Sequence, residues 1–408
     1  MIVARPRHRA MLPALNADSN PDNVAALRYQ HFVQRALLAY VVIVILLLTL
    51  SPFRFASPPP WRISWLGTED TPANFLLFLP VGFFFRLALP PHVRGGLLAT
   101  LLLGTAFSAA IEITQLWLPA RLTSLFDVIA NGLGALAGAI FCVAVRRRLH
   151  RTLPQVLTLE LPMLNVFYLS LPLMWLGGLG IEDGSPRAWL LAPLGALGAL
   201  IISGLWRHRF HAAAHMPRFV VVLVTAAWFV FGGFVIMQRA PEIVAQCALV
   251  VLLVTCVGLY RPAHAAFAER RFERRLLLAV WPVAVLYALM VVAWPLPDTL
   301  LPPDFALGYP EYWFRREHTF RIAEQLGTLT LLGYLVGESF GRFPQARKRT
   351  YLITFALALL LELVHGFLPG DRASALRAVL GMIAGGFGCQ LYAAQLNLIR
   401  VLNDQHEG

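Results

Sequence analysis

The stretch that decides the fold lies at residues 70–138, which include NFLLFLPVGFFFR at 74–86 and SAAIEITQLWLPARLTSLFDVIANGLGALAG at 108–138. Three long apolar segments make up this stretch, and each of them carries polar side chains. These are Asn74, Glu112, Gln115, Asp127 and Asn131, with Arg121 in the short link between the last two segments. Ionisable and amide groups are expensive in hydrocarbon, so their presence inside apolar segments marks a candidate functional site.

The composition of the whole chain is that of a membrane protein. Of its 408 residues, 58% are hydrophobic and 14% are charged, whereas a soluble domain has about 25% charged residues. The mean hydropathy is +0.65, and the apolar residues lie in blocks of roughly 20, the length that spans a bilayer as a helix. Strand-type alternation is absent. We therefore predict an all-α polytopic transmembrane bundle.

The apolar blocks predict about twelve spans and five regions along the chain. A cytoplasmic tail is expected at 1–34, a four-helix unit at 35–150, a middle four-helix block at 151–275, a second four-helix unit at 276–400 and a short cytoplasmic tail at 401–408. The expected spans lie near 35–51, 73–89, 95–118, 125–145, 163–181, 188–206, 219–237, 241–260, 276–295, 319–338, 350–368 and 373–397.

The positive charge is distributed as expected for a membrane protein and not for a nucleic-acid-binding protein. The formal net charge is +12, but the basic residues sit in short connections between apolar blocks, which is the positive-inside pattern. This pattern predicts a multi-pass protein with both termini in the cytoplasm and the lipid bilayer as its main partner. Under that threading the polar groups of residues 70–138 lie at the extracytoplasmic helix ends.

Spacing predicts that these polar groups converge. Glu112 and Gln115 are three residues apart and share a helix face, as do Asp127 and Asn131, which are four apart. The short connection between the two helices makes them antiparallel neighbours, with Arg121 at the rim. The resulting pocket has two chemical interpretations, a carboxylate base beside an arginine that clamps an anion, or a ligand site without chemistry. A network that only locks the helices together is the alternative to both.

The last third of the chain resembles a weakened copy of the first, which favours a parallel repeat. Glu362 and His365 have the spacing of Glu112 and Gln115. The pair also has the spacing of metal ligands in helix bundles, but it occurs once, so we expect neither a metal nor a cofactor. The expected counterparts in the second unit are Gln325 for Asn74, Glu362, His365, Arg372 for Arg121, Ala378 for Asp127 and Met382 for Asn131.

The polar pattern of residues 70–138 resembles that of the VanZ-like family of bacterial integral membrane proteins. The shared features are an Asn…Pro-x-Gly segment, then Ser-x-x-x-Glu-x-x-Gln, then Arg…Asp-x-x-x-Asn-x-x-Gly. The resemblance implies a bacterial inner-membrane protein of the cell envelope, in a family named after a member linked to low-level teicoplanin resistance. The position of the polar cluster at the outer interface leads us to expect that this pocket binds or modifies a lipid, a lipid-linked cell-envelope precursor or a peptidoglycan-related ligand. A transporter or flippase and a non-catalytic membrane scaffold remain the alternatives.

Overall fold

The computed structural model describes most of the chain. The described residues are 21–50, 55–57, 59, 63–64, 71–89, 93, 95–119, 122–152, 154–207, 217–260, 269–299, 301–307, 316–340, 347–369 and 371–407. Within them the structure is all-α, apart from four two-residue strands and one short 3₁₀ helix.

The helices follow the apolar blocks along the chain. The first group is α1 (Pro21–Leu50), α2 (Thr71–Ala88), α3 (Gly96–Gln115) and α4 (Leu125–Thr152). A middle group follows, with α5 (Pro154–Leu179), the 3₁₀ helix η1 (Pro186–Leu190), α6 (Leu191–Leu205), α8 (Arg218–Arg239) and α9 (Pro241–Tyr260). The last group is α10 (Glu269–Ala293), α11 (Arg316–Phe340), α12 (Arg347–His365) and α13 (Ala375–Glu407).

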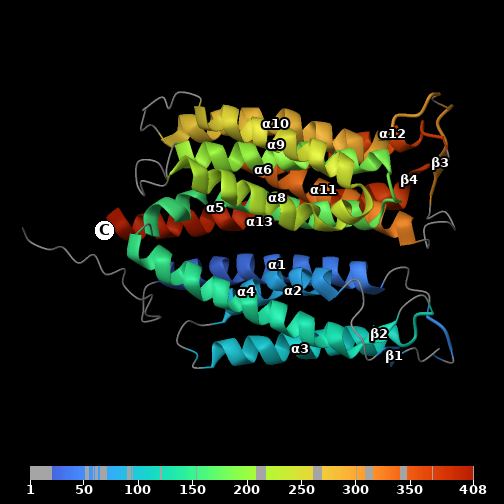
Figure 1. Cartoon of the computed structure of the whole chain (residues 1–408). Helices are drawn as coiled ribbons and strands as arrows, with labels where there is room; N and C mark the ends of the chain where they lie inside the picture. Colours follow the sequence, from blue (N-terminus) through green and yellow to red (C-terminus); the bar gives the residue numbers. More distant parts are fainter. Residues whose placement is uncertain are drawn as a thin grey trace, which may run out of the picture.

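All of these helices run roughly along one axis (Figure 1). Helices α1 to α4 form one layer, and α1 packs against α13 to join this layer to the rest of the bundle. The four short strands form two separate pairs at the same end of the bundle, opposite to the C-terminus (Figure 1). The chain therefore places the two polar segments that the sequence singles out at the same end of the molecule.

The short strands tie the inter-helix connections together in two similar pairs. Strand β1 (Ile63–Ser64) pairs in parallel with β2 (Thr123–Ser124), immediately before α4. Strand β3 (Phe305–Ala306) pairs in parallel with β4 (Ala373–Ser374), immediately before α13.

The number of membrane spans is smaller than the sequence suggested. Within the described part of the chain, eight helical segments are long and apolar enough to cross a membrane, and the prediction of twelve spans was wrong on this point. Two shorter apolar helices lie at Asn74–Ala88 and Met163–Leu179. Helices α11 and α12 do not qualify because charged and polar side chains lower their hydropathy. Several of these polar side chains are buried inside the bundle, where the protein and not lipid surrounds them.

Glycines bring two helix pairs into close contact. A Cβ atom on Gly138 of α4 would overlap the carbonyl oxygen of Leu79 and lie 2.8 Å from the backbone nitrogen of Phe83 on α2. A Cβ atom on Gly388 of α13 would likewise overlap the carbonyl oxygen of Thr330 and lie 2.8 Å from the nitrogen of Tyr334 on α11. Small residues let membrane helices approach closely in this way, which is why α2–α4 and α11–α13 form extensive interfaces.

Candidate functional site: a polar cavity at one end of the bundle

Glu112 closes the connection that leads into α4. This side chain is 6% exposed, and its Oε2 accepts a hydrogen bond of 2.8 Å from the backbone nitrogen of Ser124. The hydroxyl of Thr123 donates to the carbonyl oxygen of Glu112 at 3.2 Å. The carboxylate therefore satisfies one of the backbone donors that the start of a helix leaves open.

Two other polar groups of the first unit form hydrogen bonds to different partners. Asn131 donates to the hydroxyl of Ser108 at 2.8 Å, and both residues are buried. Gln115 instead donates to the carbonyl oxygen of Thr49 on α1 at 2.9 Å. Asp127 is 4% exposed and Asn74 is half-buried, while Arg121 lies outside the described residues. This cluster ties helices α1, α3 and α4 together.

Glu362 has the same place in the second group of helices. Its Oε1 accepts a hydrogen bond of 2.7 Å from the backbone nitrogen of Ser374, which again precedes a helix. The Nε atom of Arg377 donates to both carboxylate oxygens at 2.8 Å, and Gln325 donates to Oε2 at 3.3 Å. Both members of the ion pair are nearly inaccessible, with side-chain exposures of 4% for Arg377 and 3% for Glu362.

These contacts can be compared with the matches expected between residues 35–150 and 276–400. Arg377 and Gly381 follow Ser374 by three and seven residues, the same offsets by which Asp127 and Asn131 follow Ser124, whereas the sequence interpretation had matched Ala378 and Met382 to them. Arg372 does not contact Glu362. Its side chain is 57% exposed and pairs with Asp304 at 2.7 Å, because it points outward from the loop before α13.

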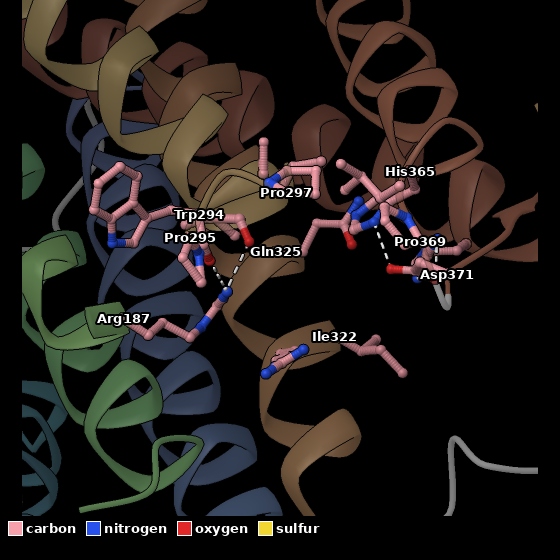
Figure 2. A pocket seen from close by; sticks show the side chains of 15 residues that line it. Arg187, Trp294, Pro295, Pro297, Ile322, Gln325, His365, Pro369 and Asp371 are labelled. Carbon is pink, nitrogen blue, oxygen red and sulfur yellow. Dashed lines mark hydrogen bonds and ion pairs between the residues drawn. The ribbon is translucent and has the colours of Figure 1, made fainter. Parts of the chain in front are cut away.

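A cavity of about 200 Å³ lies beside this second cluster. Gln325, His365, Asp371 and Arg377 contribute to its lining. Figure 2 shows Arg187 and Trp294 on one side and His365 and Asp371 on the opposite side. The remaining lining residues are Val291, Val292, Ala293, Pro295, Pro297, Arg321, Ile322, Leu368 and Pro369, of which Pro295, Arg321 and Pro369 are exposed.

Arg187 fixes the inner wall of the cavity. This residue is 4% exposed, and its guanidinium donates to Glu324 at 3.0 Å and to the carbonyl oxygens of Val291 and Trp294 at 3.0 and 3.1 Å. The hydroxyl of Tyr287 donates to the other oxygen of Glu324 at 3.0 Å. The Nε–H of Arg187 is buried without a hydrogen-bond acceptor among the described residues.

His365 and Asp371 form a hydrogen-bonded pair on the opposite wall. The Nδ1 atom of His365 lies 2.7 Å from Oδ2 of Asp371. Burial alone raises the pKa of Asp371, but the hydrogen bond and charge of His365, the charge of Arg377 and the backbone N–H of Arg372 outweigh it and lower the pKa from 3.8 to about 2. Asp371 is therefore ionised at neutral pH and accepts the hydrogen bond from Nδ1 of His365.

The sequence indicated only part of this site. It pointed to Gln325, Glu362 and His365, and it missed Arg187 and Glu324, which are 137 residues apart in the sequence. The available signal was the pairing of one arginine in an apolar block with one glutamate in another, since a buried charge in a membrane bundle requires a partner. Among the described residues, no group of three His, Cys, Asp or Glu side chains is arranged to hold a metal ion.

A comparison with protein families matches residues 23–146 to the VanZ/LLP1 family. The match covers the segment from α1 to the larger part of α4, which includes Glu112, Asp127 and Asn131. No curated protein and no solved structure matches the chain significantly. The cavity lies outside the matched segment. Residues 23–146 of this multi-pass membrane protein therefore form a VanZ/LLP1 domain.

Proposed function

We propose that the cavity binds the phosphate group of an anionic membrane lipid or a lipid-linked precursor of the cell envelope. The observation that supports this most directly is the Nε–H of Arg187, a buried donor at the cavity wall that lacks an acceptor. A buried donor without a partner costs free energy, which a ligand oxygen would restore. Guanidinium groups also match the geometry of phosphate oxygens.

Charge and size favour a head group as the ligand. Three arginines line the cavity and one carboxylate, Asp371, does so, while Glu324 and Glu362 lie behind Arg187 and Arg377. Sites for drug-sized ligands enclose about 300–1,000 Å³, and this cavity measures about 200 Å³. It therefore suits a phosphate group with a few neighbouring atoms, and the acyl or isoprenoid chain would stay in the bilayer.

The positive-inside rule supports an extracytoplasmic position for the cavity. The end of the bundle opposite to the strands carries the basic connections, including Arg207, Arg218, Arg275, Lys348 and Arg349. This orientation places both chain termini in the cytoplasm and suits a bacterial inner membrane. A ligand on that side would belong to the envelope, and susceptibility to teicoplanin is the phenotype to measure in a host that lacks the protein.

We also propose that α10–α13 is a diverged copy of α1–α4. The paired strands, the Glu–Ser hydrogen bonds and the glycine contacts recur with a nearly constant separation in the sequence. The charges at two equivalent positions are exchanged, Arg121 and Asp127 against Asp371 and Arg377. In this proposal the polar groups of α1–α4 mainly hold the helices together, whereas those of α10–α13 line a cavity.

The binding proposal can be tested with the purified protein in detergent and dioctanoyl phosphatidic acid as the probe. Arg321→Gln removes the exposed cation at the mouth, and we expect the affinity to fall at least tenfold. Arg372→Gln is the matched control, because this arginine is also exposed but does not line the cavity. Dioctanoyl phosphatidylcholine should bind weakly.

Inorganic phosphate separates two sources of the ligand. Binding of phosphatidic acid alone identifies a lipid phosphate, and comparable binding of inorganic phosphate shows that the anion is sufficient. Binding is measured by calorimetry. If neither phosphatidic acid nor inorganic phosphate binds, or if Arg321→Gln and Arg372→Gln lose affinity equally, the proposal is overturned.

A further inference from the structure

We propose that the cavity hydrolyses the phosphate monoester of its lipid ligand, with Nε2 of His365 as the general base and Asp371 as its positioning residue. This inference rests on the proposed binding function. It concerns the second unit of the chain, outside the segment that matches the VanZ/LLP1 family.

The hydrogen bond between His365 and Asp371 defines which nitrogen can act as a base. Because Asp371 accepts from Nδ1 at 2.7 Å, Nδ1 carries a proton, and when the imidazole is in its neutral form the lone pair is on Nε2. An aspartate that holds a histidine in this tautomer, and that stabilises the imidazolium once it forms, is the arrangement that activates histidine bases in hydrolases.

The unpartnered nitrogen belongs to a residue that lines the cavity. His365 is 7% exposed and lines the cavity, and its Nε2 is buried without a hydrogen-bond partner among the described residues. A histidine that served only to join α12 to the following loop would need Nδ1 alone. The unpartnered nitrogen on one wall and the unpartnered Nε–H of Arg187 on the other are complementary to a water molecule and a phosphate oxygen (Figure 2).

Asp371 is itself held rigidly. Its Oδ1 accepts a hydrogen bond of 2.8 Å from the backbone nitrogen of Arg372, and the guanidinium of Arg377 lies at 3.5 Å. Arg377 is in turn fixed by Glu362 and by the carbonyl oxygen of Arg372. A base that is oriented by such a network keeps its geometry when the substrate enters.

The proposed reaction consumes one water molecule. Nε2 of His365 takes a proton from water, the water oxygen forms a bond to phosphorus, and the bond between phosphorus and the lipid oxygen breaks. The imidazolium then returns its proton to the departing lipid oxygen, so that the products are inorganic phosphate and a lipid alcohol. Arg187 and Arg321 would stabilise the negative charge on the phosphoryl oxygens during transfer.

The experiment measures release of inorganic phosphate from dioctanoyl phosphatidic acid by the full-length protein in detergent. We expect His365→Gln to lower kcat by about 100-fold to 10,000-fold, the usual contribution of a general base, while the affinity for the lipid changes less than about threefold. Glutamine is a conservative choice, because Gln115 has the corresponding place beside Glu112 in the first unit. Asp304→Asn is the control, since this acid pairs with Arg372 and does not line the cavity.

The role of Asp371 is tested by comparing the effects of its substitution on kcat and on KM. Asp371→Asn should lower kcat at an unchanged KM, and Asp371→Glu should recover part of the loss, because only the carboxylate fixes the tautomer. A wild-type protein that binds phosphatidic acid without releasing phosphate overturns the catalytic inference and leaves the binding proposal standing. A wild-type protein that does not bind the lipid removes both, and equal kcat values for wild type and His365→Gln remove the role of the histidine.

Discussion

At the scale of single residues, Glu362 shows how a carboxylate is kept inside this bundle. It accepts hydrogen bonds from Ser374, Arg377 and Gln325, which belong to the β4 connection, α13 and α11. Removing one partner of such a buried pair leaves an uncompensated charge, whereas replacing both partners with neutral groups avoids that cost. A substitution of Glu362 or Arg377 alone is therefore expected to destabilise the protein more than a substitution of both.

We predict that Arg377→Met destabilises the protein by about 3–5 kcal/mol. The double variant Glu362→Gln, Arg377→Met should recover a large part of that loss, because the remaining amide carries no charge. Unfolding in detergent of the wild type, the two single variants and the double variant gives the coupling energy. Additive losses in this cycle would contradict the ion-pair interpretation.

At the scale of the elements, two helix crossings depend on glycine. The Cα of Gly138 lies against α2 and that of Gly388 against α11, with no room for a methyl group at either point. Gly386 lies on the same helix as Gly388 but faces the ring of Tyr351, which would be 3.6 Å from an added Cβ, an ordinary contact distance. An added side chain is therefore expected to disturb the packing of α13 at Gly388 and not at Gly386.

We predict that Gly388→Ala costs about 1–3 kcal/mol, as expected for an overpacked contact. Gly138→Ala should have a cost of the same size if the two units are related copies. Gly386→Ala should be neutral or slightly stabilising, because alanine favours a helix over glycine. Thermal unfolding of the three variants under the same conditions tests this prediction. Similar losses of stability in Gly386→Ala and Gly388→Ala would show that the close contact between α11 and α13 does not determine the effect.

The sequence predicted the elements better than it predicted their contacts. Helices formed where apolar blocks of roughly 20 residues occur, because length and hydropathy are local properties. The partners of Glu362 could not be assigned in this way, since Arg372 is nearer to Glu362 in the sequence but points outward to Asp304, whereas Arg377, 15 residues away, points inward. Arg187 and Glu324 are 137 residues apart, so their pairing depends on the tertiary fold.

At the scale of the whole molecule, the alternating direction of the helices gives the bundle two chemically different ends. The strands and the cavity occupy one end, where Glu182 and Asp298 are exposed, and Lys348 is exposed at the start of α12 near the other end. The four cysteines are free, and Cys142, Cys247 and Cys389 are buried. Single reactive cysteines can therefore report the orientation of the protein in a cysteine-free background.

We predict that Asp298→Cys and Glu182→Cys react with a membrane-impermeant maleimide in intact cells, whereas Lys348→Cys reacts only after the membrane is permeabilised. The physical reason is the bias of arginine and lysine toward the cytoplasmic side. Labelling of Lys348→Cys alone in intact cells would reverse the proposed orientation. Labelling of Asp298→Cys and Glu182→Cys from different sides would contradict the arrangement of the helices.

The cavity is formed jointly by η1 and the helices from α10 onward, so findings on proteins that lack these elements do not apply to it. A chain made only of the VanZ/LLP1 domain at residues 23–146 would contain none of Arg187, Gln325, His365 or Asp371. A phenotype or ligand discovered in such a single-domain relative would therefore describe the part of this molecule that lacks the cavity. What the rest of the chain does has to be learned from proteins that carry the additional helices, and from this one first.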